Sequence, residues 1–131
     1  MILPFVRRRL LSDPKKLGRW GERQSEKYLS RRGFKFIARN FRCKIGEIDL
    51  IMSDESGAIV FIEVKTRRNE SLANAQDAVN LHKRHKLINS AKYFVKQYEI
   101  KGRPLRFDVM AVVLGETGPV EIRHYRNAFV P

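Results

Sequence analysis

Residues 58–66 read Ala-Ile-Val-Phe-Ile-Glu-Val-Lys-Thr, an apolar run that two charged residues, Glu63 and Lys65, interrupt. A β-strand turns residues i and i+2 to the same face, so this carboxylate and this ammonium emerge side by side from a segment that should be buried. Burying two charges is costly unless each finds a partner or a metal ion. The run therefore predicts a strand whose charged pair is balanced by a divalent ion and a phosphate.

Apolar runs on both sides of a turn predict a β-hairpin that contains this strand. Residues 45–52 form its first strand, Ser-Asp-Glu-Ser-Gly at 53–57 forms the turn, and residues 58–66 form its second strand.

The register of the hairpin decides which side chains meet. The turn length places Ile51 near Phe61. Asp49 then falls near Glu63, with Lys65 one pleat further on, so both carboxylates share a face. A slip by one residue would invert the faces. The other face of the first strand is expected to carry Ile48, Leu50 and Met52.

Helix and strand patterns alternate along the rest of the chain. Ser12-Asp13-Pro14 combines a capping side chain with a proline, and the helix it starts should run to about Arg32 and stop at Gly33. Further elements are expected as a strand at 34–41, a helix at 80–98, an almost continuous apolar strand at 105–114 and a strand at 120–125. The order α-β-β-β-α-β-β predicts a three-layered α/β fold, with a mixed five-stranded sheet flanked by helices.

Two segments carry further structural expectations. Residues 1–11 show no clear period and are expected to form a loose basic arm of one 131-residue domain. The helix at 80–98 should face the core with six apolar side chains, Leu81, Leu87, Ile88, Ala91, Val95 and Tyr98.

Composition narrows the class of protein. The single cysteine, Cys43, excludes an internal disulfide and a Cys-based zinc cluster, and suits a reducing cytosol. No apolar run approaches the ~18 residues that span a bilayer. The apolar start precedes Arg7-Arg8-Arg9, the wrong order for a signal peptide. We therefore expect a cytoplasmic protein that does not bind membranes.

The net charge of +13 is unevenly distributed. Residues 1–45 carry 14 Lys/Arg against 3 Asp/Glu, residues 46–81 carry 3 against 7, and residues 82–108 carry 8 against 2. An acidic island between two basic stretches predicts a metal-binding carboxylate cluster flanked by surfaces that bind a polyanion. The basic residues expected to contact phosphates are Arg7, Arg8, Arg9, Arg23, Arg67, Lys83, Arg84 and Lys86.

Five motifs resemble those of the YraN-like family of small bacterial proteins. They are Gly18-x-x-Gly-Glu22, Ala38-Arg-Asn-Phe41, Gly46-Glu-Ile-Asp-Leu-Ile51, Phe61-Ile-Glu-Val-Lys-Thr-Arg67 and Arg106-Phe-Asp-Val109. That family belongs, by resemblance, to the restriction-endonuclease-like superfamily, whose signature is an Asp followed by a strand that ends Asp/Glu-x-Lys. The chain is also similar to archaeal Holliday junction resolvases. The resemblance implies a restriction-endonuclease-like core and a nuclease activity.

The candidate chemistry follows from the donor types. Asp49 and Glu63 are hard oxygen ligands of the kind that Mg²⁺ or Mn²⁺ prefers, and the Val64 carbonyl is a plausible third ligand. Lys65 can orient or deprotonate the attacking water, or neutralise charge at the phosphate. Glu22, from the first helix, is a further candidate for catalysis or a second metal, and Glu47 is a weaker one that supports the site.

Gly18 and Gly21 cost the first helix about 1 kcal/mol each relative to alanine, so close approach of a backbone or a ligand is expected there. The alternative is tight packing on the sheet without a ligand.

Arg106 and Asp108 have the same i, i+2 spacing as Glu63 and Lys65, but we interpret them as a structural ion pair. His82, His85 and His124 show no metal-ligand spacing, so surface or backbone-contact roles are expected.

These patterns favour a metal-dependent endonuclease acting on DNA in preference to RNA, selective for branched or single-stranded structures. Two alternatives stay open: a non-catalytic nucleic-acid-binding module that retains the nuclease fold, and an interaction adaptor in DNA uptake or recombination. The oligomeric state is open, with a homodimer as one option.

Overall fold

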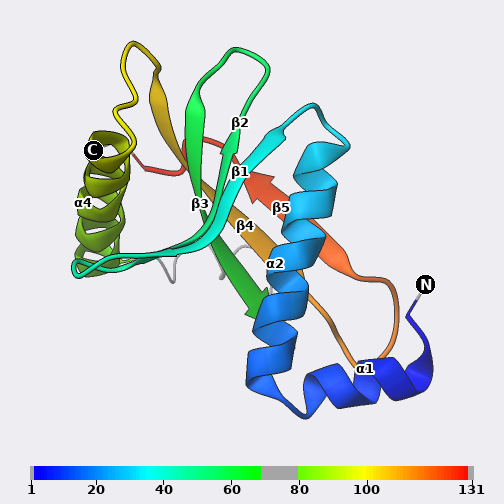
Figure 1. The fold of residues 1–131 in the computed structure, drawn as a ribbon. Helices are drawn as coiled ribbons and strands as arrows, with labels where there is room; N and C mark the ends of the chain where they lie inside the picture. Colours follow the sequence, from blue (N-terminus) through cyan, green and yellow to red (C-terminus); the bar gives the residue numbers. More distant parts are fainter. Residues whose placement is uncertain (1, 69–79, 130–131) are drawn as a thin grey trace.

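The computed structural model describes residues 2–68 and 80–129. The elements in chain order are α1 (Pro4–Leu11), α2 (Pro14–Ser30), β1 (Lys35–Arg42), β2 (Glu47–Ser53), β3 (Ile59–Arg67), α4 (Leu81–Gln97), β4 (Leu105–Val113) and β5 (Glu121–Tyr125). Figure 1 shows their arrangement.

The five strands form one mixed sheet in the order β1-β2-β3-β4-β5. β3 and β4 run parallel, connected through α4, and the other neighbours are antiparallel. Ile51 pairs with Phe61, which is the register that the turn length predicted. The predicted apolar strand, β4, lies between β3 and β5, an internal position in the sheet.

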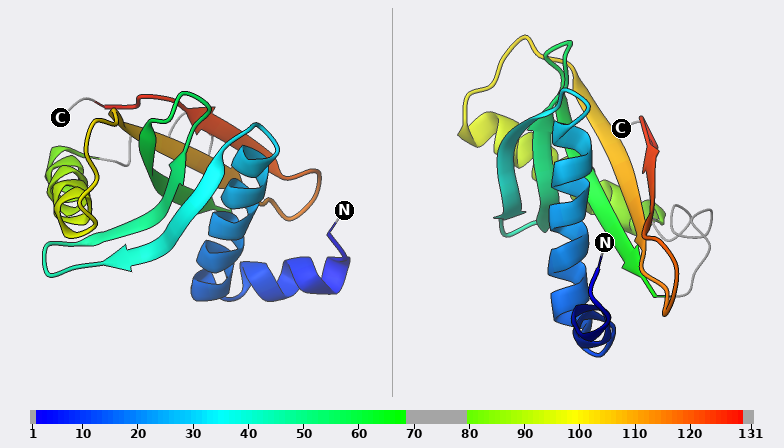
Figure 2. Two further views of the ribbon diagram at one scale, coloured as in Figure 1. Left: turned by 45° about the horizontal axis from the view of Figure 1, so that its top comes forward. Right: turned by 90° about the vertical axis from the view of Figure 1, so that its right-hand side faces the viewer.

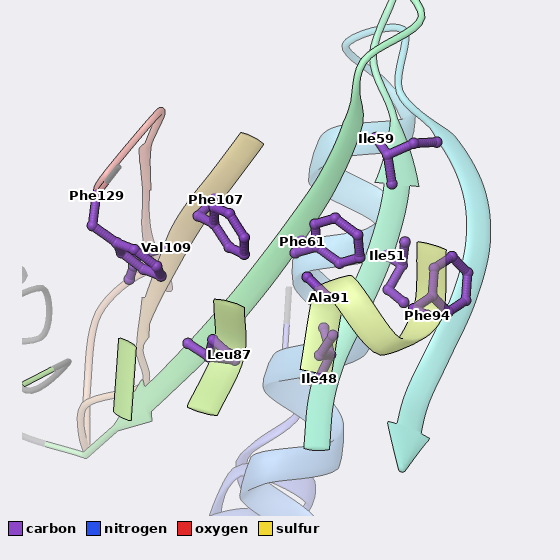
Figure 3. Packing of buried hydrophobic residues seen from close by; sticks show 10 residues of the cluster. All are labelled: Ile48, Ile51, Ile59, Phe61, Leu87, Ala91, Phe94, Phe107, Val109 and Phe129. Atoms are coloured by element: carbon purple, nitrogen blue, oxygen red, sulfur yellow. The ribbon is translucent and has the colours of Figure 1, made fainter. Parts of the chain in front are cut away.

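Helices cover both faces of the sheet (Figure 2). One buried cluster joins the sheet to α4 through residues such as Phe61, Ala91 and Phe94 (Figure 3). A second cluster on the opposite face joins Leu29 of α2 to Ile62 and neighbouring strand residues. The predicted α/β fold with a mixed five-stranded sheet between helices is therefore confirmed.

The N-terminal segment corrects one expectation. Residues 1–11 were expected to lack regular structure, but Pro4–Leu11 form α1, which adds a helix to the predicted element order. Its stability comes from tertiary contacts: Leu10 is buried in a third cluster with Leu17 and Leu114. Arg7 donates hydrogen bonds to the Gly115 and Gly118 carbonyl oxygens at 2.6 and 2.8 Å.

Both long helices begin at a capping side chain, and the cap of α2 lies in the predicted Ser12-Asp13-Pro14 start. Asp13 accepts hydrogen bonds from the first-turn N–H groups of α2, and Asn80 does the same for α4 through the Lys83 N–H. Gly33, with a φ of +91°, follows the end of α2 as expected. The prediction of which α4 residues face the core was partly wrong. Leu81 and Tyr98 are 71% and 57% exposed, whereas Phe94, which was not predicted to face the core, is buried.

β2 departs from simple alternation. Ile48 was expected to share a face with Leu50 and Met52, but it packs in the same cluster as Ile51. Pairing of β2 with β3 ends at Leu50, and Asn40, in the neighbouring strand, has a φ of +52°. The strand therefore loses its regular pleat just where Asp49 lies.

Arg106 and Asp108 form the structural ion pair that the sequence predicted. Asp108, 1% exposed, accepts hydrogen bonds from Arg106 and from the Asn127 N–H. A surface or backbone-contact role was expected for His124. Its Nε2 instead lies 2.6 Å from Asp108 Oδ2, where the antiparallel register pairs β4 with β5. A second carboxylate, Asp54, contacts Arg106 Nη1 at 2.6 Å.

Candidate functional site

The site begins where β2 and β3 separate. Regular pairing of β2 with β3 ends at Leu50 and Ile62. The residue just before Leu50 in the chain, Asp49, turns its carboxylate to the unpaired edge of β3. Asp49 Oδ2 accepts the Val64 N–H at 2.8 Å, so a side-chain oxygen takes the place of a strand carbonyl. This contact fixes Asp49 against the Glu63-Val-Lys65 segment.

Glu63 is the centre of the charged group. Its side chain is 8% exposed, and its Oε1 lies 3.2 Å from Lys65 Nζ and 2.7 Å from Lys83 Nζ. Lys65 comes from the same face of β3, as the i, i+2 spacing predicted, whereas Lys83 comes from the first turn of α4. The buried carboxylate thus has two cationic partners, which offset the cost of its burial.

Close packing of α2 on β3 brings Glu22 to the site. Gly21 is buried, and a Cβ there would overlap the Thr66 side chain, so only glycine allows this approach. At Gly21 the structure therefore shows the alternative, tight packing on the sheet, because the neighbour is a strand side chain and neither a backbone nor a ligand. Around Gly18, by contrast, no described atom lies within 4 Å of an added Cβ, and Gly18 lines the cleft described below.

The carboxylates raise one another's proton affinity. Burial first, and then the charge of Glu63, raises the pKa of Asp49 to about 8, although the Val64 N–H opposes the shift. Burial and the Glu47 charge raise the pKa of Glu22 from its ordinary value. Burial and the neighbouring carboxylates therefore both favour the protonated form of Asp49 and Glu22 in the metal-free protein.

The pKa values of Lys65 and Lys83 shift in opposite directions. Burial, followed by the contact with Lys83, lowers the pKa of Lys65. Burial also disfavours the charge of Lys83, but the hydrogen bond and attraction to Glu63 outweigh it and raise the pKa of Lys83. Lys83 is thus the more firmly protonated of the two.

Asp49→Asn should stabilise the metal-free protein at alkaline pH. The folded-state pKa of Asp49 lies above its ordinary value of 3.8, so the wild type loses stability as pH rises from about 4 through 8. The Asn variant keeps an acceptor for the Val64 N–H and escapes this loss. We expect a gain of up to about 6 kcal/mol at pH 9, the full value of a pKa shift from 3.8 to about 8, that vanishes below pH 4, measured by urea unfolding in chelator. A constant difference across pH would contradict the assignment.

A cleft of about 630 Å³ opens over these groups. Its lining includes Glu22, Asp49, Glu63, Val64, Lys65 and Lys83. The structure therefore brings together all the predicted catalytic residues. Glu47 lies at the margin: its charge acts on Asp49, but its side chain is 44% exposed and lies 3.6 Å from Arg42.

The donor set fits Mg²⁺ or Mn²⁺. Among residues 2–68 and 80–129, no group of three or more His, Cys, Asp or Glu side chains is arranged to hold a metal ion. Mg²⁺ needs fewer, because it uses one or two carboxylates and completes its shell with water and phosphate oxygens. Asp49 and Glu63 supply such a pair. After burial, the repulsion from Glu63 is the next cause of the raised Asp49 pKa, and a bound cation would relieve that repulsion.

The residues expected to contact phosphates are dispersed. Arg67 and Lys83 line the main cleft, and Arg23 lines a small hollow beside Glu22 and Asp49. Arg8 and Arg9 lie on the exposed side of α1, whereas Arg7 is bound to carbonyl oxygens. Along α4, Arg84 lies over the Phe129 ring at 5.4 Å and Lys86 is exposed.

Sequence reasoning missed the place of Lys83 inside the charged group. It was expected only as a phosphate contact on a basic helix. A weak signal was available, since a lysine in a first turn without an acidic residue opposes the helix dipole and calls for an anionic neighbour.

No helix in the described part of the chain combines the length and apolarity required to cross a membrane.

A model of the uncharacterised protein family UPF0102 matches residues 21–112. A UPF0102 protein of Caldicellulosiruptor saccharolyticus is 38% identical over 116 residues, which are 88% of this chain and 98% of the relative. A UPF0102 protein of Clostridioides difficile is 40% identical over 117 residues, 88% of this chain and 97% of the relative. These matches confirm the resemblance seen in the five motifs.

Two solved structures align with parts of the chain, both at 25% sequence identity. A chain of the EndoMS-dsDNA2 complex covers 57% of this chain at a TM-score of 0.33. A repair endonuclease from Pyrococcus abyssi covers 71% at a TM-score of 0.43. This chain spans only 26% and 37% of those two chains, and overlaps this partial assign it neither an activity nor a partner.

Proposed function

We propose a function from the site itself, because this chain belongs to the uncharacterised protein family UPF0102, whose description names no activity. The proposed activity is metal-dependent hydrolysis of phosphodiester bonds in DNA. One observation carries it: Asp49, Glu63 and Lys65 converge, largely buried, on the floor of an open cleft with Glu22 beside them. Structural stability alone gives no reason to gather carboxylates with raised pKa values around a cleft.

Each residue has a distinct task in this proposal. Asp49 and Glu63 would hold Mg²⁺ or Mn²⁺, with the Val64 carbonyl as a further candidate ligand. The bound ion would supply positive charge for the attacked phosphate. Lys65 orients the attacking water. Because burial lowers its pKa, a larger fraction of Lys65 than of an exposed lysine is the neutral amine, which is the form that can accept the proton of the water. Glu22, whose pKa is raised, would hold a water or a second ion at the cleft wall.

The net charge of +13 supports a polyanionic substrate. Arginine and lysine contacts to phosphates position a nucleic acid without reading its sequence. We therefore propose recognition through backbone shape, with branched or single-stranded DNA as the substrate class.

One observation favours a second candidate, a binding module that retains the nuclease fold. Glu63 already has two cationic partners, and Oε1 contacts both of them. A group satisfied in this way can be a purely structural ion pair. In that case the basic residues would bind DNA and no bond would be cut.

Calorimetric titration with Mn²⁺ tests the metal site that the proposal requires. The wild type should bind Mn²⁺, and Asp49→Asn should weaken binding by about 10-fold or more, since it removes one of two charged ligands. Glu121→Gln, an exposed carboxylate on β5, serves as the control and should match the wild type. Equal affinities for wild type and Asp49→Asn would remove the site.

A further inference from the structure

Lys83 and Lys65 share one carboxylate oxygen. Their Nζ atoms lie 2.7 and 3.2 Å from Oε1 of Glu63, so two like charges meet at a single acceptor. A carboxylate has about four acceptor positions, and an ion that took this oxygen would compete with both ammonium groups. Such an ion would therefore displace at least one of the two lysines.

The two lysine side chains differ in their exposure to solvent. The Lys65 side chain is 9% exposed and rises from the centre of the sheet, so packing fixes it. The Lys83 side chain is 39% exposed and lines the cleft from its rim. Its backbone is held by the hydrogen bond from its N–H to Asn80 Oδ1 at 3.0 Å. Only the Lys83 side chain has room to move.

The position of Lys83 in α4 favours an anionic partner, and Glu63 supplies one. Lys83 lies in the first turn, where exposed N–H groups and the helix dipole disfavour positive charge, and that turn contains no acidic residue. Glu63 compensates for this placement. A divalent ion at Glu63 would remove the compensation and repel the ammonium towards the open cleft, where a phosphate is the available anion.

We infer that Lys83 is a second cation of the site, which holds Glu63 in the metal-free protein and transfers to a substrate phosphate when a divalent ion takes that carboxylate. This inference rests on the proposed function and adds a phosphate-binding residue from outside the Glu63-Val-Lys65 strand. It also makes metal binding and DNA binding cooperative through one side chain. Cooperativity of this kind is reciprocal: each ligand strengthens the other.

DNA affinity gives a first readout. With Ca²⁺, another hard cation for oxygen ligands, Lys83→Met should weaken binding of a labelled DNA about threefold to tenfold relative to the wild type. In chelator, where Glu63 holds Lys83, the same variant should bind like the wild type. An equal loss under both conditions makes Lys83 an ordinary phosphate contact and overturns the inference.

Mn²⁺ titration of Lys83→Met in the absence of DNA is the closing experiment. The methionine keeps the apolar stem and removes the competing charge, so Mn²⁺ affinity should rise about 10-fold. Lys92→Met, an exposed lysine further along α4, makes the same change in net charge and should leave the affinity unchanged. Lys83→Gln provides a second variant if the methionine protein folds poorly.

The outcomes separate this inference from the proposed function. Tighter binding by Lys83→Met than by Lys92→Met supports it, whether or not the wild type binds measurably. Binding by the wild type that Lys83→Met leaves equal or weaker overturns the inference while the metal site stands. Failure of every variant to bind removes the metal site and the inference together.

Discussion

Lys65→Ala is expected to lower the rate of DNA cleavage about 10²–10³-fold, which corresponds to about 3–4 kcal/mol of barrier, while DNA affinity stays nearly unchanged. The Lys65 ammonium lies at the floor of the cleft beside Glu63, where it can position the water but makes at most one of many phosphate contacts. Losing one contact costs far less in binding than losing a catalytic group costs in rate.

The fold should survive Lys65→Ala. Glu63 keeps Lys83 as a partner at 2.7 Å, so the substitution leaves no buried charge alone. Lys92→Ala, on the exposed side of α4, is the control for a general loss of positive charge. Cleavage assays and DNA titrations on the three proteins check the prediction. A variant that cuts at the wild-type rate would show that the activity comes from elsewhere.

Asp108→Ala is expected to reduce the free energy of unfolding by about 3–5 kcal/mol at pH 7. Asp108 accepts hydrogen bonds from Arg106 at 2.9 and 3.0 Å and from the Asn127 N–H at 2.9 Å, and it contacts His124 at 2.6 Å. Without it, the Arg106 guanidinium, whose side chain is 16% exposed, retains only Asp54 of the two carboxylates. The network ties β4 and β5 to the turn after β2.

The pH dependence gives this prediction a second check. Burial alone would raise the pKa of Asp108, but hydrogen bonds from His124, Arg106 and Asn127 outweigh it and hold the pKa below the ordinary value of 3.8. Its contribution is therefore present above about pH 4 and is lost as pH falls through the folded-state pKa. Denaturant unfolding of Asp108→Ala should approach wild-type stability in strong acid. Glu121→Ala should lie within about 0.5 kcal/mol of wild type, and a similarly small loss for Asp108→Ala would contradict the prediction.

The sequence predicted the strand-borne part of the site because its rules are local. Period-two alternation put Glu63 and Lys65 on one face, and a five-residue turn set the pairing of Ile51 with Phe61. Those two facts were enough to bring Asp49 to Glu63. The end of β2–β3 pairing at Leu50 was not predictable in the same way, because it depends on β2 leaving β3 while it stays paired with β1. Ile48 was therefore placed on the wrong face.

Contacts between distant elements were the part that pattern reasoning missed. Lys83 reaches Glu63 because α4 rotates so that Phe94 is buried and Leu81 is exposed, a choice made by packing and not by periodicity. α1 has no periodic signal, and its helix depends on Leu10 and Arg7 meeting residues more than a hundred positions away. His124 meets Asp108 only through the register of the last two strands.

Cleavage by the wild-type protein tests the central claim most directly. Labelled double-stranded, single-stranded and branched DNA, with matched RNA, would be incubated with purified protein in Mn²⁺, Mg²⁺ or chelator. The proposed function predicts cuts in DNA with either metal, none in chelator, and a preference for branched or single-stranded forms. Intact substrates under every condition, from a protein that still binds DNA in a salt-dependent way, would contradict the nuclease assignment and leave the binding module in its place.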